Sequence, residues 1–240
     1  MGRYGRRVIL VLAALLASLS SSMCAWQAAQ PADAPAQLPQ QKLIALTFDD
    51  GPRRSTTTRL LDGLAERGVK ATFFLIGRQI ADNEDVVERM DREGHQIGIH
   101  TFDHVQLTAL NQTDFDAQVG TTRALLEDLL GHNGFLLRPP FGKWDEGVKN
   151  HAGCPIILWS IDPEDWDDKD TDRVVKEVVS QARDGSIILL HDIYPESVDA
   201  ALQIVDCLHA QGYYFCTIDQ LFAARGRSLG QGEVYSNAYP

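Results

Sequence analysis

Two adjacent carboxylates, Asp49 and Asp50, follow an apolar run at residues 43–46 and precede Gly51 and Pro52. The apolar run predicts a buried strand and the Gly-Pro pair ends regular structure, so both acids lie at a strand end. Burying an ionised carboxylate costs several kcal/mol unless a cation or hydrogen-bond donors accompany it. The pair therefore indicates a metal ligand, a general base or both, and a tight turn with solvated acids is the alternative.

Two histidines four residues apart, His100 and His104, follow another strand-like run at residues 95–99. On one side of a helical turn they would present two imidazole nitrogens to one cation. With Asp50 they make a set of two nitrogens and one oxygen that leaves positions for water and substrate, as in catalytic zinc-type sites. Asp49 is then free to take a proton from the water that the metal acidifies. Two surface histidines after a strand are the alternative.

A further imidazole, His191, follows the apolar run at residues 186–190. In its protonated form it can donate a proton to a leaving group. Either Asp165 or Asp162, which follow the run at residues 156–160, can raise its pKa and hold its tautomer.

Arg138 follows the short run at residues 135–137 and can pair with Asp49 across the same edge. A pair between Arg138 and Asp165 is the alternative. Trp166 follows an acidic turn, where its ring fits either a wall that stacks on a sugar or an aromatic cap on the core.

Alternating apolar runs and helical spacings cover most of the chain. Strands are predicted at residues 43–46, 71–76, 95–99, 135–137, 156–160, 186–190 and 213–217. Helices are predicted at residues 59–67, 82–93, 113–130, 145–152, 172–182, 197–211 and 219–224. Continuous apolar strands between amphipathic helices favour a parallel sheet covered on its outer face, and no dinucleotide-binding glycine pattern follows the first strand. We expect a single α/β domain with a closed or nearly closed (β/α) barrel, and a doubly wound open sheet is the alternative. The polar clusters then meet at the C-terminal ends of the strands.

The composition is that of a globular protein with one sizeable core: 240 residues, 44% hydrophobic and 23% charged. A formal net charge of -11 argues against a nucleic-acid or anionic-membrane surface and suits a neutral or cationic ligand. Three arginines, an apolar run too short to span a membrane and three serines open the chain. This order predicts a signal peptide at residues 1–23, and hence a secreted or periplasmic, cell-envelope protein; a lipid anchor at Cys24 is the alternative.

The remaining chain divides by composition into three parts. Residues 24–41 are rich in Ala, Gln and Pro and predict a flexible leader. The catalytic domain is expected at residues 42–224, and residues 225–240 form a tail without readable periodicity. Cys207 and Cys216, like Cys154, lack paired C-x-x-C spacing, which argues against a structural zinc site. We expect buried thiols, and a disulfide between Cys207 and Cys216 is the alternative.

Five short motifs resemble those of the polysaccharide deacetylases, carbohydrate esterase family four. They occur in the family's order across residues 42–224, and together they are highly specific. The motifs are Thr47-Phe48-Asp49-Asp50-Gly51-Pro52, His100-Thr101-x-x-His104, Arg138-Pro139-Pro140-Phe141-Gly142, Asp162-x-x-Asp165-Trp166 and Leu189-Leu190-His191.

The resemblance implies a distorted (β/α) barrel that hydrolyses N-acetyl groups of N-acetylglucosamine-containing polysaccharides, such as peptidoglycan or chitin-like chains. It implies a divalent metal, with zinc expected and cobalt, nickel or manganese as alternatives. We also expect a monomer, and no transmembrane helix, because the N-terminal apolar run is too short to span a membrane. By resemblance, Asp49 is the general base, His191 the general acid, Arg138 and Asp165 their partners, and Asp50, His100 and His104 the metal ligands. Phe141, Trp166 and Leu189 would line the substrate pocket, and the backbone N–H of Phe141 would face the oxyanion.

Four positions depart from the family pattern: Phe141 replaces a tyrosine, Ile99 an asparagine, and Asp103 and Val105 replace the serine and the proline on either side of the second histidine. None of these changes removes a ligand, although Asp103 adds a negative charge near the metal. An acetylxylan O-deacetylase is the nearest alternative function, because the same site can attack either acyl bond. A non-catalytic carbohydrate-binding relic and a metal-carrying binding protein are the alternatives from other classes.

Overall fold

The central element of the fold is the strand β1 (Lys42–Asp49), whose residues from Ile44 onward are all buried. The computed structural model describes residues 41–240. In this part of the chain seven shorter strands join β1 in one sheet: β2 (Thr72–Leu75), β3 (Gln96–Ile99), β4 (Leu136–Leu137), β5 (Ile156–Ile157), β6 (Ile187–His191), β7 (Tyr213–Phe215) and β8 (Val234–Tyr235).

All pairings between these strands are parallel, in the order β6-β1-β2-β3-β4-β5-β8, with β7 beside the first half of β1. The sheet curls, and a bridge between Ile161 and Ile188 links the segment after β5 back to β6. The prediction of a distorted (β/α) barrel with about seven parallel strands is therefore confirmed, and β8 adds a short eighth strand. The doubly wound open sheet is not adopted.

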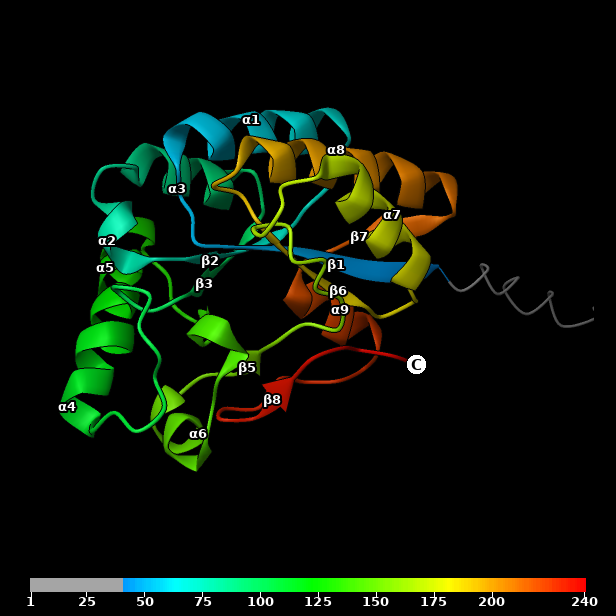
Figure 1. Ribbon diagram of the computed structural model, residues 1–240. Helices are drawn as coiled ribbons and strands as arrows, with labels where there is room; N and C mark the ends of the chain where they lie inside the picture. The colour runs from blue at the N-terminus through cyan, green and yellow to red at the C-terminus, as the bar shows by residue number, and fades with distance from the viewer. Residues whose placement is uncertain (1–40) are drawn as a thin grey trace, which may run out of the picture. The chain divides into compact units, whose positions relative to one another are not determined.

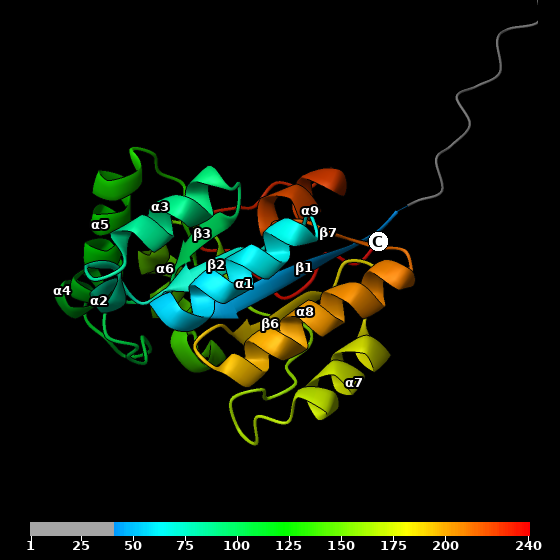
Figure 2. The same cartoon turned by 90° about the horizontal axis from the view of Figure 1, so that it is seen from above.

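The helices follow the strands in alternation. They are α1 (Arg54–Glu66), α2 (Gly77–Ile80), α3 (Glu84–Arg92), α4 (Gln112–Phe115), α5 (Thr121–Leu130), α6 (Glu146–Ala152), α7 (Thr171–Gln181), α8 (Pro195–Ala210) and α9 (Ile218–Ala224), with a π-turn η1 (Asp116–Gly120) and a 3-10 turn η2 (Pro140–Gly142). Figure 1 shows α1, α3, α7 and α8 on one side of β1 and α9 with β8 on the other. Seen from above, α1 and α8 run side by side over the sheet (Figure 2).

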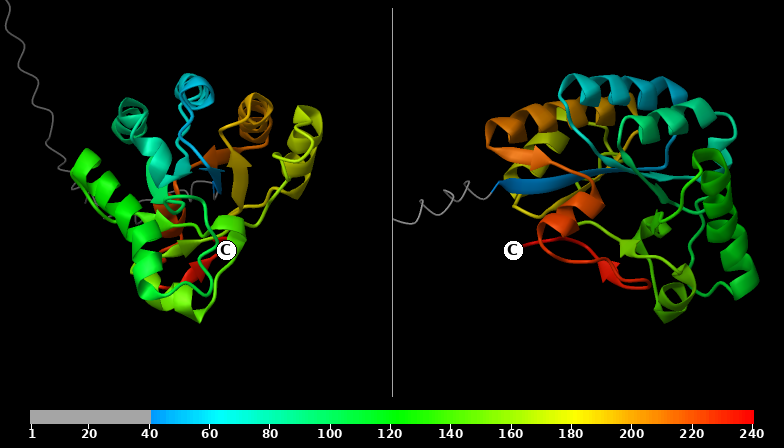
Figure 3. Two further views of the ribbon diagram at one scale, coloured as in Figure 1. Left: turned by 60° about the vertical axis from the view of Figure 1, so that its left-hand side comes forward. Right: turned by 180° about the vertical axis from the view of Figure 1, so that it is seen from behind.

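The sheet separates two apolar cores, because successive side chains of a strand point to opposite faces. On the outer face, residues such as Leu46, Phe73 and Ile188 pack against α1, α3, α5, α6, α7 and α8. On the inner face, residues including Ala45 and Phe74 pack against α9. Figure 3 shows the outer helices arranged around the curled strands. The inside of the curl is thus a packed core at the N-terminal ends of the strands.

Several boundaries differ from the predicted ones for local reasons. The predicted helix 113–130 consists of α4, η1 and α5, so its periodicity passes through a π-turn. The tail at residues 225–240 contributes to the sheet, because its strand β8 pairs with β5 and Ala238 is buried. A two-residue strand is too short to leave a readable period in the sequence.

The three cysteines of the described residues are free thiols. Cys154 and Cys216 are buried as expected, whereas Cys207 is exposed on α8, so the expectation of a buried thiol is wrong there. The predicted signal peptide (1–23), Cys24 and almost all of the predicted leader (24–41) lie outside the described residues. No helix within residues 41–240 is long and apolar enough to cross a membrane.

Gly98 of β3 provides a test of the inner core. A Cβ at this position would lie 2.5 Å from the Phe74 ring, which Gly98 faces across β2 and β3. We expect Gly98→Ala to lower the free energy of unfolding by about 1–3 kcal/mol, because a well-packed core does not accept the added methyl without strain. Urea unfolding of the purified variant measures this loss.

Gly120→Ala is the matched control, since its nearest new neighbour, Asp116 Cβ, lies 3.7 Å away and its backbone is helical. This variant should keep or raise the stability. Equal stability of Gly98→Ala and the unchanged protein would contradict the packing described here.

Candidate active site

The candidate active site lies where the inner face of the sheet reaches the C-terminal ends of the strands. Every second residue of a strand points to this face, and the last such residue is polar in four places. These four residues are Asp49 of β1, His100 after β3, Arg138 after β4 and His191 of β6. Three of them, Asp49, His100 and His191, line one cavity of about 430 Å³. It is lined by every predicted site residue except Arg138 and Asp165, which are fully buried.

Three of the lining side chains form a cluster suited to a metal ion. Ligand atoms of Asp50, His100 and His104 all lie within 4.8 Å of one another. Asp50 Oδ1 is 3.5 Å from His100 Nε2 and 3.4 Å from His104 Nε2. Ligand atoms of a tetrahedral zinc site with bonds of about 2.0–2.2 Å lie about 3.3–3.6 Å apart. The two distances from Asp50 therefore fit a zinc-sized cation, and Asp50 Oδ1 is buried without a hydrogen-bond partner among residues 41–240.

The tautomer of His100 is determined by its neighbour. Its Nδ1 lies 2.7 Å from the carbonyl oxygen of Arg138, which can only accept a hydrogen bond. Nδ1 therefore carries a proton, which leaves Nε2 as the nitrogen that faces Asp50 and the cluster. Burial lowers the pKa of His104 below its ordinary value, which favours the neutral ring that metal binding requires.

The histidines do not lie on a helical turn, and this expectation is wrong. Residues 100–104 form a loop in which Thr101 and His104 have left-handed backbone angles, with φ of 67° and 60°. Asp50 has a similar φ of 72°. These turns bring His104 back toward His100, with ring centroids 5.0 Å apart. The spacing of four residues thus brings both rings to one site through a loop and not through helical periodicity.

Asp49 is paired with the buried guanidinium of Arg138. Arg138 Nη1 donates to Asp49 Oδ1 at 2.8 Å and to the hydroxyl of Thr47 at 2.8 Å. The other carboxylate oxygen, Oδ2, lies 3.6 Å from His100 Nε2 and so faces the metal-ligand cluster. The alternative pair of Arg138 with Asp165 does not form. Asp49 thus keeps one oxygen free toward the cluster.

His191 is held by Asp165 and not by Asp162. Its Nδ1 lies 2.7 Å from Asp165 Oδ1, and its backbone N–H donates to Asp165 Oδ2 at 2.9 Å. Burial by itself lowers the pKa of His191, but the hydrogen bond and charge of Asp165, with the charges of Asp49 and Asp50, outweigh it and raise the pKa to about 9. The imidazole is therefore protonated at neutral pH, with Nδ1 engaged and Nε2 free to donate.

Apolar and aromatic groups complete the cavity. Leu189 lies on β6 two residues before His191 and points to the same face of the sheet. Trp166 is half exposed after the acidic turn. Phe141 has a left-handed φ of 61° and places its ring edge-on to His104, with centroids 4.8 Å apart. Two further lining residues, Trp159 and Tyr194, were not predicted. Trp159 lies near the end of the predicted strand 156–160. Because it belongs to an apolar run, the sequence pattern does not distinguish it from a core residue.

Asp192 is a buried acid beside the site whose role the sequence did not indicate. Its carboxylate accepts a short hydrogen bond from the Thr57 hydroxyl of α1, and burial raises its pKa to about 7. A Cβ on Gly51 would lie 2.5 Å from Asp192 Oδ1. The glycine after Asp50 is therefore required by this contact, which joins the loop after β1 to the end of β6.

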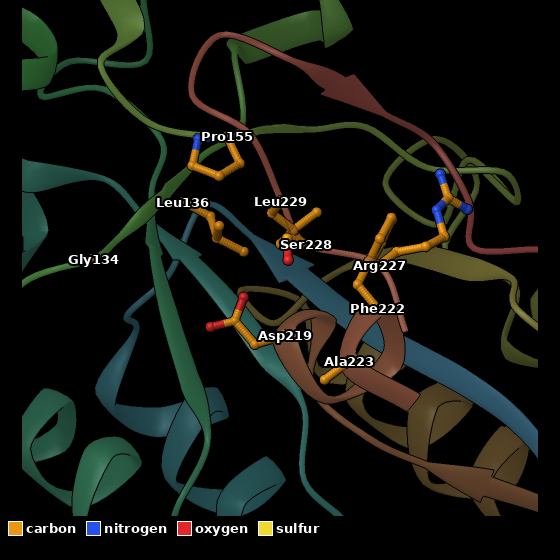
Figure 4. Close-up of a pocket in the computed structure, with 9 residues that line it drawn as sticks. All are labelled: Gly134, Leu136, Pro155, Asp219, Phe222, Ala223, Arg227, Ser228 and Leu229. Carbon is orange, nitrogen blue, oxygen red and sulfur yellow. The ribbon is translucent and has the colours of Figure 1, made fainter. Parts of the chain in front are cut away.

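A second cavity, of about 380 Å³, lies at the opposite end of the sheet (Figure 4). Leu136 of β4 and Phe222 of α9 contribute apolar walls, and Asp219 and Ser228 contribute polar groups. Pro155, just before β5, also lines it, which places this cavity at the N-terminal ends of the strands. None of the predicted site residues lines it, so the chemistry belongs to the first cavity.

Known proteins share this fold and its motifs. The chain matches the polysaccharide deacetylase family over residues 36–153. It is 40% identical over 183 residues to the peptidoglycan N-acetylmuramic acid deacetylase PdaC of Bacillus subtilis strain 168, covering 76% of this chain and 39% of that protein. The chain thus spans about two fifths of the length of this relative.

Solved structures of related proteins superpose on this chain over nearly their whole length. A structure described as a T48 deacetylase with substrate superposes with a TM-score of 0.78 at 40% identity, covering 82% of this chain and 97% of that one. A family 4 acetyl xylan esterase from Clostridium thermocellum, in complex with a cobalt ion, superposes with a TM-score of 0.78 at 30% identity, covering 82% and 98%. The chain belongs to the polysaccharide deacetylase family.

The pairing of His191 with Asp165 can be tested without any substrate. In metal-free protein, Asp165→Asn should lower the pKa of His191 well below about 9, because burial remains while the hydrogen bond and the charge of Asp165 are lost. An NMR titration of the His191 ring measures the pKa directly.

Asp162→Asn is the matched control, since Asp162 lines the same cavity but accepts its hydrogen bond from the backbone of Glu164. It should change the pKa of His191 far less. A His191 pKa that stays near 9 in Asp165→Asn would show that another group protonates the ring.

Proposed function

We propose that this protein is a metal-dependent hydrolase that removes N-acetyl groups from N-acetylglucosamine-containing polysaccharides, such as peptidoglycan or chitin-like chains, and releases acetate. The observation that carries the proposal is one cluster of three metal-ligand side chains with a carboxylate and a protonated imidazole beside it in the same cavity. The peptidoglycan deacetylase among its relatives supports the substrate class.

The residues that would hold the metal are Asp50, His100 and His104. A divalent ion bound there would acidify a water and polarise the acetamide carbonyl. Two imidazole nitrogens and one carboxylate oxygen form a donor set that suits zinc, and the cobalt ion in the related esterase supports cobalt as an alternative.

Asp49 is proposed as the general base. Arg138 occupies its Oδ1, which leaves Oδ2 turned toward the metal-ligand cluster and available for the proton of the attacking water. The buried guanidinium also holds the carboxylate in place, so the base does not have to be ordered at the moment of reaction.

His191 is proposed as the general acid. Asp165 holds Nδ1, so the proton on Nε2 is the one presented to the cavity. A pKa of about 9 keeps that proton in place at neutral pH, and transfer to the departing amine nitrogen leaves a neutral sugar amine to be released. The backbone N–H of Phe141 is proposed as the oxyanion donor, and Leu189 and Trp166 as walls for the acetyl group and the sugar.

Acetylxylan O-deacetylation is the second candidate, and it is supported by the acetyl xylan esterase among the related structures. The base, the acid and the ligand cluster serve ester and amide hydrolysis alike. The presence of Asp49 and His191 in one cavity argues against a non-catalytic binding protein. We also propose that the protein is exported to the cell envelope or beyond, which the arginine-led apolar N-terminus and the peptidoglycan-acting relative support.

Asp49→Asn tests the proposed function. The variant should lose acetate release by roughly 10²- to 10⁴-fold, because the base is removed, while it still binds metal through Asp50, His100 and His104. Acetate is measured with N-acetylglucosamine oligomers, peptidoglycan and acetylated xylan, with chelator and with added zinc or cobalt.

Asp167→Asn is the control. Asp167 is an exposed acid next to Trp166 that does not line the cavity, so this variant should keep the full rate. Near-normal turnover by Asp49→Asn would remove Asp49 from the role of base. Release of acetate from xylan alone would favour the esterase.

A further inference from the structure

The loop between the two proposed histidine ligands is held from both sides by groups outside it. Left-handed backbone angles at Thr101 and His104 are unfavourable for residues with a Cβ, so this loop shape needs external support. His100 follows β3 directly, and its Nδ1 donates a hydrogen bond to the backbone carbonyl of Arg138, whereas His104 lies at the far end of the loop. The position of His104 therefore depends on what holds residues 101–103.

One side of the loop is fixed by the start of α2. The backbone N–H of Gly77 donates to the carbonyl of Thr101 at 2.9 Å, and that of Arg78 donates to the carbonyl of Phe102 at 3.1 Å. A Cβ on Gly77 would collide with Phe102, so the loop and the helix are in close contact. These bonds satisfy two of the loop's carbonyl groups but none of its N–H groups.

The other side is fixed by a single side chain, Gln118. Its Oε1 accepts hydrogen bonds from the backbone N–H groups of Phe102, at 3.1 Å, and Asp103, at 2.9 Å. Its Nε2 donates to Asp103 Oδ2 at 3.1 Å. One amide thus binds the backbone N–H groups of the two residues directly before His104 and also the carboxylate of the second of them.

Gln118 lies inside the π-turn η1, within the helical segment formed by α4, η1 and α5. A π-turn adds a residue to one turn of a helix and so changes the direction of the side chains around it, and such turns are frequent at functional sites. The hydroxyl of Thr122 donates to the carbonyl of Gln118 at 2.9 Å, which supports the widened turn. The irregularity in the helix and the loop that carries His104 therefore meet at one residue.

We propose that Gln118 is a positioning residue for the metal site, which holds His104 at the place where it can bind the ion together with Asp50 and His100. The inference rests on the ligand set of the proposed function. Gln118 contributes no atom to the cavity, so its effect passes through the loop backbone. Groups that orient metal ligands from behind typically change metal affinity by 10- to 100-fold when they are removed.

Gln118→Ala tests this role through metal affinity and not through turnover alone. The Kd for zinc, measured by competition with a chromophoric chelator, should rise by about 10- to 100-fold, because the loop loses the acceptor for two N–H groups. At saturating zinc the kcat should return close to that of the unchanged protein, since Gln118 touches no reacting atom. The thermal midpoint of the metal-free variant reports whether the fold itself has changed.

Gln112→Ala is the matched control, because Gln112 lies in α4 and its amide also donates to a carboxylate, Asp116, at 2.8 Å, whereas it makes no hydrogen bond to residues 100–104. Its zinc affinity should equal that of the unchanged protein. An unchanged Kd in Gln118→Ala, or an equal loss in Gln112→Ala, would overturn the proposal. Failure of the unchanged protein to bind zinc would overturn the ligand set and this inference with it.

A second pair of variants decides the question if Gln118→Ala does not fold. Gln118→Glu keeps both acceptor bonds but sets a second carboxylate against Asp103, so zinc binding should weaken. Adding Asp103→Asn restores a donor to face the new carboxylate and should recover most of the affinity, whereas Asp103→Asn alone should not raise it. Absence of recovery in the double variant would contradict the role of this contact.

Discussion

The buried guanidinium of Arg138 is the interaction on which the rest of the site depends. It is fully enclosed, and its nitrogens donate to Asp49 and Thr47 of β1 and to the carbonyls of Ile157 and Leu158 at β5. The backbone carbonyl of Arg138 accepts a hydrogen bond from His100, and the guanidinium carbon lies 4.1 Å from the centre of the Phe74 ring. A buried charge that lost one of these partners would be strongly destabilising, so the surrounding strands are held in a single arrangement. Through this one residue the proposed base and a proposed ligand share a common support.

The site follows from the pleat of the sheet. The same face of β1 that buries Ala45 carries Asp49 two steps further on, and the same face of β6 that buries Ile187 carries His191. Apolar residues therefore fill the curl at one end of the strands and polar residues line it at the other. Because the strands are parallel, their C-terminal ends lie at the same edge of the sheet, and side chains distant in the sequence therefore lie close together there.

This regularity explains what could be predicted from the sequence. Apolar runs and the residues that end them were sufficient for the parallel sheet and for placing Asp49, His100, Arg138 and His191 together. Features set by loops and tertiary contacts were not readable. The backbone turns around His104, the choice of Asp165 over Asp162 as partner of His191, and the π-turn at Gln118 leave no periodic pattern, because they are determined by hydrogen bonds between segments far apart in the chain.

The helix α9 and the apolar residues that it covers have a consequence for the proposed polysaccharide substrate. Because Phe222 of α9 and the inner-face residues Ala45, Phe74 and Ile187 form one buried cluster inside the curl, a polysaccharide would have no passage through the barrel. In the proposed function, the polysaccharide would instead lie across the C-terminal ends of the strands, where the cavity opens. A sugar in the middle of the polysaccharide could then reach the cavity, and no free chain end would be needed.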